Sequence, residues 1–285
     1  MSTLKIIDPG IYTSVQDLGR YGYQHYGMPV SGAMDAYSSE FANALLGNNK
    51  NDAVLEMTMT GAELQFDVPT IIAITGANMH PKLNGKSVMM FKSIPINAND
   101  ILSIGQATNG FRTYIAVKGG FLTEMVLGSR SMAKGITSVV RVKKDDVLDI
   151  ENYSGLFRSK NAKLKFNASI IDTDVFNVTQ GPEFDKLSKE QQRLLFTQEF
   201  RVSKHNNRMA YQLLPVLKNN LKSILTSPVL PGTVQLTPSG QLIVLMRDAQ
   251  TTGGYPRILQ LTEQSINIIS QKTTANRLKM SITKL

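Results

Sequence analysis

The residues best suited to chemistry lie near the C-terminal end, in the run RDAQTTGGYPRI at 247–258. An acid, an amide, two hydroxyls, two glycines, a tyrosine and a proline follow one another there. Adjacent glycines forgo side-chain packing and Pro256 lacks a ladder donor, so we expect a shaped loop and no strand. The apolar run at 242–245 and the segment RILQLT predict that two strands carry this loop. Such loops are typical of binding sites, and a tight turn with the glycine pair at positive φ is the simpler alternative.

A second polar stretch, TSVQDLGRYGYQHYGMPVSGAMD at 13–35, again combines Gln, Asp and Arg with glycines. Glycine loses the most backbone entropy on ordering, so holding this sequence in one conformation is costly. A ligand-binding loop would justify that cost, and a structural Ω-loop is the alternative. Gly-containing turns also occur in AITGANM, TYIAVKGGF and LGSRSM, where backbone N–H groups can be presented to a ligand.

Four acids stand in distinctive contexts: Asp17, Asp35, Glu56 and Asp248. Each could orient a polar substrate or act as a base, and each could equally cap a helix or close a turn. The chain has no GxxxxGK[ST] run, no GxGxxG opening a helix and no G-x-S-x-G. We therefore expect neither an ATP site nor a serine-hydrolase site in this chain alone.

Composition narrows the function classes further. The 285 residues include no cysteine, which excludes disulfides, thiolate nucleophiles and zinc–thiolate sites, and the three histidines lie far apart, so we expect no metal site. The net charge of +9 is scattered over polar segments without interleaved aromatics, which argues against nucleic-acid binding. No apolar run approaches the length of a membrane span, and MSTLKIIDPG lacks a signal-peptide core. We expect a cytoplasmic protein that binds neither nucleic acid nor membrane.

Short β-type runs dominate the chain and predict a mainly antiparallel β fold of barrel or sandwich type. The expected strands lie at 70–75, 87–91, 100–104, 113–117, 146–150, 175–179, 233–237, 241–246 and 278–282. Two helices are expected: one over 35–46, with Asp35 as N-cap and Tyr37, Phe41 and Leu45 on one face, and one behind the Ser188–Gln191 capping box. The polar stretch at 152–167 predicts a boundary between two β-rich units, 1–155 and 156–285.

Taken together, the motifs resemble one known family. TSVQDLGRYGYQHYGMPVSGAMD, AVLEMTMTGAEL, AITGANM, YIAVKGG, LGSRS and SPVLPGTVQLTPSGQLIVLMRDAQTTGGYP are similar to the family that contains the C subunit of 5-oxoprolinase, KipA and allophanate hydrolase subunit 2-like, biotin-dependent carboxyltransferase-like proteins. The resemblance extends from residue 9 to residue 258. It implies a fold of two cyclophilin-like β-barrel units with a few short helices.

The resemblance also implies partners and a reaction. Members act with a KipI-like protein of the B type, and the oxoprolinase also needs its A subunit; the complex spends ATP to open the lactam of 5-oxoproline to glutamate. On this basis Asp17, Asp248 and Thr252 are expected to be catalytic. The expected substrate-binding residues are Gln16, Arg20, Ser31, Glu56, Arg208, Gln235, Gln250, Thr251, Gly253, Gly254 and Tyr255. We further expect the 13–35 and 247–258 loops to share one ligand surface.

The chain departs from the family pattern at two places. Residues 132–148 keep little of the usual glycine, and NNRMAY at 206–211 has Asn207 where an acid is usual. Loss of a carboxylate beside the retained Arg208 could uncouple an ion pair or remove a catalytic group. The family's activity is therefore less firmly expected than its fold.

Three functions are compatible with this sequence. The first is a subunit of ATP-dependent 5-oxoprolinase, an amidohydrolase complex in which this chain is expected to be inactive alone and to bind no cofactor. The second is a carboxyltransferase or allophanate/urea amidolyase-type component, for which biotin would have to arrive on another protein, because no Met–Lys–Met–Glu-like acceptor occurs. The third is a KipA-like regulator that binds a kinase inhibitor.

Overall fold

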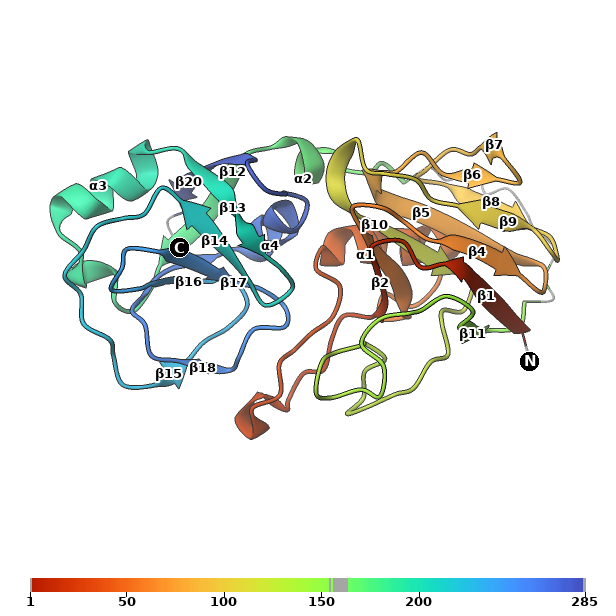
Figure 1. Ribbon diagram of the computed structural model, residues 1–285, viewed down its shortest axis with the longest axis horizontal. Coiled ribbons are helices and arrows are strands. Elements are labelled where there is room, and N and C mark those ends of the chain that lie inside the picture. Colours follow the sequence, from red (N-terminus) through yellow and green to blue (C-terminus); the bar gives the residue numbers. More distant parts are fainter. Residues whose placement is uncertain (1, 154, 156–163, 284–285) are drawn as a thin grey trace. The chain divides into compact units, whose positions relative to one another are not determined.

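The computed structural model describes residues 2–153, 155 and 164–283, which form two compact units (Figure 1). The first unit contains Met1–Arg20 and Ser31–Ile171, and the second contains Tyr21–Val30 and Asp172–Leu285. The boundary expected between 155 and 156 adjoins residues outside the described part of the chain, so it stays a prediction.

Two antiparallel sheets build the first unit. The six-stranded sheet has the order β11 (Val147–Ile150), β1 (Ser2–Asp8), β4 (Glu63–Phe66), β9 (Ile101–Ser103), β6 (Lys82–Leu83) and β7 (Lys86–Ser87). The five-stranded sheet has the order β2 (Tyr12–Gln16), β3 (Val54–Thr58), β10 (Asn109–Val117), β5 (Thr70–Asn78) and β8 (Ser93–Ile96).

Side-chain alternation explains the core of the first unit. Strand β1 turns Leu4 and Ile6 inward, and they join Phe66, Ile72 and Ile115 in one apolar cluster contributed by both sheets. Strands β3, β5 and β10 are buried on both faces, because α1 (Ala36–Leu46) covers the side opposite this cluster. The polar residues of these strands are therefore enclosed, which matters for the site below.

Helix α1 has the predicted limits but buries a different face. Asp35 caps its N-terminus by accepting the Ser38 N–H at 3.0 Å, and Gly47 ends it in the left-handed region with φ 64°. The buried side carries mainly small residues, Ser38, Ser39, Ala42, Asn43 and Leu46, which allow the helix to approach the sheet closely. The predicted aromatic face is only half-buried and packs on Phe166, whose ring lies 5.2 Å from Phe41 and 5.3 Å from Tyr37.

The second unit is a closed barrel. Its strand order is β12 (Val175–Gln180), β19 (Arg257–Leu261), β16 (Thr233–Leu236), β17 (Leu242–Leu245), β14 (Ala210–Leu214), β13 (Phe200–Asn206) and β20 (Arg277–Ile282). Strands β12 and β20 close it in parallel, and the other neighbouring pairs are antiparallel. A two-stranded ribbon, β15 (Ser227–Pro228) with β18 (Thr252–Gly253), completes the strands described for this unit.

Short helices complete the described secondary structure. They are η1 (Gln24–Tyr26), α2 (Ser169–Asp172), η2 (Phe184–Lys186), α3 (Lys189–Thr197) and α4 (Glu263–Ser270). The predicted capping box begins α3: Ser188 accepts the Gln191 N–H at 3.2 Å and donates its own N–H to Gln191 at 2.8 Å. The sequence reasoning missed α4, which Thr262 caps.

The mainly β prediction is confirmed, with differences at particular strands. Residues 87–91 were expected as one strand, but β7 ends at Ser87 and Phe91 has φ 60°, which an extended strand cannot include. The stretch at 13–35 was expected as a loop, yet its first residues belong to β2, because Tyr12–Gln16 pair in continuous register with β3. None of the described helices has the length and apolar character needed to cross a membrane.

Candidate functional site

Asp17 organises the first cluster of motif residues. Its Oδ1 accepts hydrogen bonds from Ser131 Oγ at 2.6 Å, Ser129 Oγ at 2.7 Å and the Gly19 N–H at 2.8 Å. Its Oδ2 accepts the Arg130 N–H at 2.7 Å. The side chain therefore fixes the LGSRS segment against the end of β2. This gives Asp17 a positioning role, and its assignment as a catalytic group stays a prediction.

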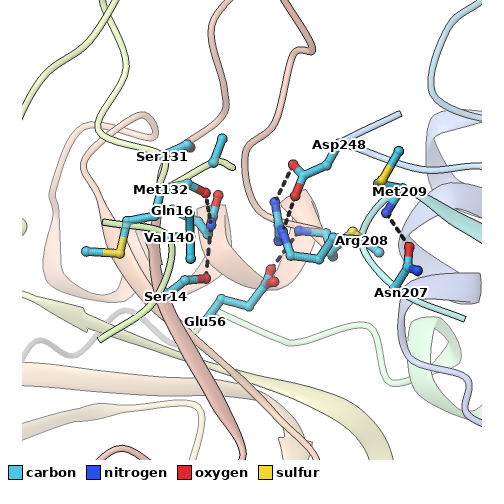
Figure 2. A network of polar contacts seen from close by, with 12 residues as sticks. Ser14, Gln16, Glu56, Ser131, Met132, Val140, Asn207, Arg208, Met209 and Asp248 are labelled. Carbon is cyan, nitrogen blue, oxygen red and sulfur yellow. Dashed lines mark hydrogen bonds and ion pairs between the residues drawn. The ribbon is translucent and has the colours of Figure 1, made fainter. Parts of the chain in front are cut away.

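Two neighbours of Asp17 hold the same segment. Arg20 is 1% exposed and donates from Nη2 to the Ser131 carbonyl at 2.6 Å. Gln16 is fully buried and donates from Nε2 to Ser14 Oγ at 2.9 Å and to the Met132 carbonyl at 3.1 Å, contacts that Figure 2 shows. The Gln-Asp-Leu-Gly-Arg motif is thus joined to residues more than 100 positions later in the chain.

Ser31 and Gly32 form a tightly wound turn beside this motif. Both have positive φ, 57° and 89°, and a Cβ on Gly32 would lie 2.8 Å from the Leu18 carbonyl carbon and oxygen. Ser31 is fully buried, and its Oγ makes no hydrogen bond within the described residues. A left-handed serine and a buried hydroxyl without a protein partner are features that concentrate at functional sites. Ser31 is therefore the strongest ligand-binding candidate of the first unit.

Glu56 lies in a buried polar network under the same turn. Its Oε2 accepts the Met34 N–H at 2.7 Å and the Tyr114 hydroxyl at 2.9 Å, and Arg112 Nε lies 3.8 Å from Oε1. The Tyr114 oxygen in turn accepts the Asp35 N–H at 2.9 Å. Burial, with the nearby Glu56 charge, raises the pKa of Tyr114 well above its ordinary range. The phenol stays protonated and donates to Glu56, so the network anchors the Ser-Gly-Ala-Met-Asp turn to the sheet.

Arg208 and Asp248 form the central pair of the second unit. The guanidinium donates from Nε to Oδ2 at 2.8 Å and from Nη2 to Oδ1 at 3.1 Å, the two-point geometry drawn in Figure 2. Their side chains are 9% and 19% exposed, so water screens the pair only weakly. The Asp248 N–H also donates to the Arg208 carbonyl at 2.9 Å. The arginine therefore orients the acid that begins the Asp-Ala-Gln-Thr-Thr-Gly-Gly-Tyr-Pro loop.

Asn207 performs a turn role that either Asn or Asp can supply. Its Oδ1 accepts the Met209 N–H at 2.8 Å, as Figure 2 shows. The same oxygen accepts the Ala210 N–H at 3.1 Å. The concern that its amide would uncouple an ion pair is resolved for Arg208, since Asp248 supplies the carboxylate.

We expect Asn207→Asp to change the free energy of unfolding by less than about 0.5 kcal/mol, because an acceptor oxygen remains at the same position. Asn207→Leu removes both acceptor contacts and should cost about 1–2 kcal/mol. Urea unfolding of the two variants measures the difference. Equal stability of the two would show that the turn does not depend on this side chain.

The loop at 248–256 combines supported backbone with accessible side chains. The Val229 N–H donates to the Thr251 carbonyl at 3.0 Å and the Ile224 N–H donates to the Gly254 carbonyl at 2.9 Å. Gln250, Thr252 and Tyr255 are exposed. The loop joins β17 to β19, as predicted, but the expectation that it contains no strand was wrong, because β18 pairs with β15. Hydrogen bonds thus hold the backbone of the loop while its polar side chains stay accessible, an arrangement that suits binding.

Gly253 packs closely against the side chain of Gln235. Neither Gly253 nor Gly254 is among the positive-φ glycines, so the tight-turn alternative is wrong. A Cβ on Gly253 would instead lie 2.4 Å from Nε2 of Gln235, a buried residue that donates to the Tyr255 carbonyl at 3.4 Å. Gln235 thus supports the loop from beneath.

A second ion pair clamps the end of the loop. Glu183 accepts from Arg257 Nε at 3.0 Å and Nη2 at 2.9 Å, and from the Arg257 N–H at 2.8 Å. Arg257 Nη1 also donates to the Pro228 carbonyl at 3.0 Å, which ties β19 to β15. Hydrogen bonding from Arg257 lowers the pKa of Glu183 from its ordinary value.

The lowered pKa predicts an acid-dependent loss of stability. Because the folded state favours the Glu183 carboxylate, this contribution is present above the carboxyl's ordinary pKa and is lost as pH falls through the folded value. We expect the acid limb of melting temperature against pH, below about pH 4.5, to flatten in Glu183→Gln. Asp185→Asn, at an exposed acid of the same unit, is the control. Identical limbs for wild type and Glu183→Gln would contradict the clamp.

A cavity of about 430 Å³ lies beside β15 and the residues just before it, which pair with the 248–256 loop. It is lined by Glu183, Lys186, Leu221, Lys222, Ser223, Ile224, Leu225 and Ser227. Ile224 and Ser227 pair with Gly254 and Gly253, so this space lies against the ribbon that carries Thr252. Its volume is in the range of small-molecule sites.

The structure thus assembles two separate polar clusters. One joins Gln16, Asp17 and Arg20 to the LGSRS segment in the first unit, and the other surrounds the Arg208–Asp248 pair in the second. They belong to different units, so their common ligand surface stays a prediction. Sequence reasoning missed Arg130 and Ser131, although the LGSRS motif that contains them was recognisable.

Comparison with known proteins identifies the family of this chain. Residues 26–281 match the family described as the carboxyltransferase domain, subdomains A and B. The chain is 34% identical to the 5-oxoprolinase C subunit of Escherichia coli (strain K12), over 94% of this chain and 87% of that protein. It is 29% identical to the 5-oxoprolinase C subunit of Haemophilus influenzae, over 99% of this chain and 92% of that protein.

Urea-metabolising proteins share the same fold. The urea amidolyase of Kluyveromyces lactis matches 99% of the chain with a TM-score of 0.89 and 27% identity. The chain spans only 19% of that solved protein. Urea amidolyase of Saccharomyces cerevisiae is 33% identical over 75% of the chain, which covers 12% of that protein. The chain therefore belongs to the carboxyltransferase domain family.

Proposed function

We propose that this chain is a subunit of an ATP-dependent 5-oxoprolinase. The observation that carries the proposal is its similarity to the 5-oxoprolinase C subunit over almost the full length of both chains. The Arg208–Asp248 pair and the loop at 248–256 also lie inside residues 26–281, the region that matches the family model. This proposal agrees with the first function expected from the sequence, a subunit of a multi-subunit amidohydrolase.

The second unit provides groups suited to opening a lactam. The reaction breaks the ring C–N bond: water adds to the carbonyl, the nitrogen leaves as an amine and glutamate results, while ATP is hydrolysed to make the unactivated carbonyl reactive. Thr252 presents an exposed hydroxyl on a braced ribbon, and Asp248 is oriented by Arg208. A hydroxyl and nearby amides stabilise a developing oxyanion, and a fixed carboxylate orients substrate or accepts a proton.

The remaining chemistry belongs to partner proteins in this proposal. The chain has no phosphate-binding loop, so ATP is bound elsewhere in the complex and this chain carries no cofactor. We assign the missing parts to a KipI-like partner of the B type and to the A subunit of the oxoprolinase. The chain alone is inactive on this account, and it works in the cytoplasm.

A carboxyltransferase role is the second candidate, because the matched family is described by that activity and the urea amidolyases share the fold. Biotin would then arrive on a separate carrier, since the sequence has no acceptor segment. The two functions differ in substrate and in the need for biotin.

Co-expression with the B-type partner and the A subunit separates these functions. We expect co-elution of the three proteins in size exclusion and ATP-dependent glutamate release from 5-oxoproline. A complete, folded complex that releases no glutamate overturns the first function, and carboxyl transfer to urea from a biotinylated carrier establishes the second. Stable binding of the B-type partner without turnover of either substrate points to the KipA-like regulator.

A further inference from the structure

A second cavity, of about 330 Å³, lies wholly within the first unit and contains none of the predicted site residues. We name it the Arg130 cavity. Its lining is Leu122, Thr123, Glu124, Arg130, Met132, Thr137, Ser138, Val139, Asp146, Val147, Leu148 and Asp149. Groups of both charges and an apolar wall therefore face one space of ligand size.

Arg130 enters this cavity from a backbone that is fixed. Its N–H donates to Asp17, and the next residue is held by Asp17 and Arg20. Its Nη1 donates to the Thr123 carbonyl. Its Nε and Nη2 make no hydrogen bond or ion pair within the described residues. An arginine with free donors on a rigid segment is suited to two-point binding of a carboxylate.

Three carboxylates, those of Glu124, Asp146 and Asp149, also line the cavity and carry the charge opposite to that of Arg130. Glu124 is oriented by Ser138, which donates from Oγ at 2.6 Å and from its N–H at 3.3 Å. Asp146 accepts the Lys143 N–H at 2.7 Å through Oδ2, and Asp149 is exposed. Three acids against one arginine would repel a simple anion, but they favour a ligand that also carries an ammonium group.

The rest of the lining adds an apolar surface and an unused polar atom. Leu122 and Val147 are 39% and 58% exposed, large fractions for aliphatic side chains, and Met132 and Leu148 lie in the same lining. Thr123 Oγ1 is buried and makes no hydrogen bond within the described residues. A ligand could satisfy this hydroxyl and cover the aliphatic side chains.

We propose that the Arg130 cavity binds a free α-amino acid with an aliphatic side chain. The α-carboxylate pairs with Arg130, the α-ammonium lies against the acidic residues, and the side chain covers the apolar wall. The cavity lining contains no residue of the second unit, and the proposal does not depend on the proposed oxoprolinase function.

Isothermal titration of the full chain with L-leucine tests the proposal. We use isoamylamine, which lacks the carboxylate, and 4-methylpentanoate, which lacks the ammonium group, as matched probes. The expected result is measurable binding of L-leucine, with both analogues at least about tenfold weaker, because each loses one charge pair. No heat change with millimolar L-leucine overturns the site, and equal binding of either analogue overturns the zwitterion.

Two variants locate the binding. Arg130→Gln removes the charge but keeps the backbone N–H to Asp17, so the segment should stay folded and L-leucine binding should weaken at least about tenfold. Arg141→Gln, at an exposed arginine outside the cavity lining, is the control and should bind as wild type does. Unweakened binding to Arg130→Gln with an unchanged melting temperature would place the ligand elsewhere.

Discussion

Asp17→Ala is expected to destabilise the first unit by about 3–5 kcal/mol, because it removes a buried carboxylate that accepts four hydrogen bonds and strands their donors. Two of these donors are backbone N–H groups, which have no rotamer with which to find another acceptor. Urea unfolding followed by circular dichroism measures the loss. The large cost reflects the role of Asp17 as the anchor of the LGSRS segment.

Asp145 offers a matched control for this measurement. It also accepts an ion-pair contact, from Lys5 at 2.8 Å, but both side chains are well exposed. Asp145→Ala should therefore destabilise the protein far less than Asp17→Ala, because water screens an exposed ion pair. Asp17→Asn, which keeps an acceptor oxygen, should fall between these two. A loss for Asp17→Ala as small as that for Asp145→Ala would refute the anchoring role.

Thr252→Val is expected to reduce activity of the complete complex by about 100-fold while leaving its melting temperature unchanged. The hydroxyl is exposed and makes no hydrogen bond within the described residues, so folding does not depend on it. Valine keeps the side-chain shape and the strand pairing of β18. An activity loss without a stability loss therefore reports a contact with the reacting substrate.

Thr283→Val is the control for this variant, because Thr283 is an exposed threonine at the far end of the second unit's sequence. Both proteins should enter the complex equally in size exclusion. Activity equal to wild type in Thr252→Val would remove this hydroxyl from the mechanism.

Local signals in the sequence predicted the elements that depend on local chemistry. Asp35 and Gly47 fixed the ends of α1, and Ser188 with Gln191 fixed the start of α3, because caps act within one helical turn. The loop between β17 and β19 was visible for the same reason, since its glycines and proline lie between two apolar runs.

Long-range contacts set the features that sequence reasoning missed. Asp17 contacts residues more than 110 positions away, and nothing in VQDLGR specifies Ser129 and Ser131 as its donors. Gly253 was interpreted through its backbone freedom, whereas the structure gives it an ordinary φ and places it against the distant Gln235 side chain. The prediction that the aromatic residues of α1 form its buried face was wrong. The helix instead packs on the sheet through mainly small side chains, which allow a closer approach than aromatic ones.

The most direct test of the central claim is a reconstitution of 5-oxoprolinase activity from purified proteins. The B-type partner and the oxoprolinase A subunit are incubated with ATP and 5-oxoproline, this chain is titrated in, and glutamate is measured. The account predicts that glutamate release rises with added wild-type chain and saturates at a fixed stoichiometry, whereas Thr252→Val joins the complex but releases glutamate about 100-fold more slowly. Full release in the absence of the chain, or none at saturation with a folded, assembled complex, would contradict it.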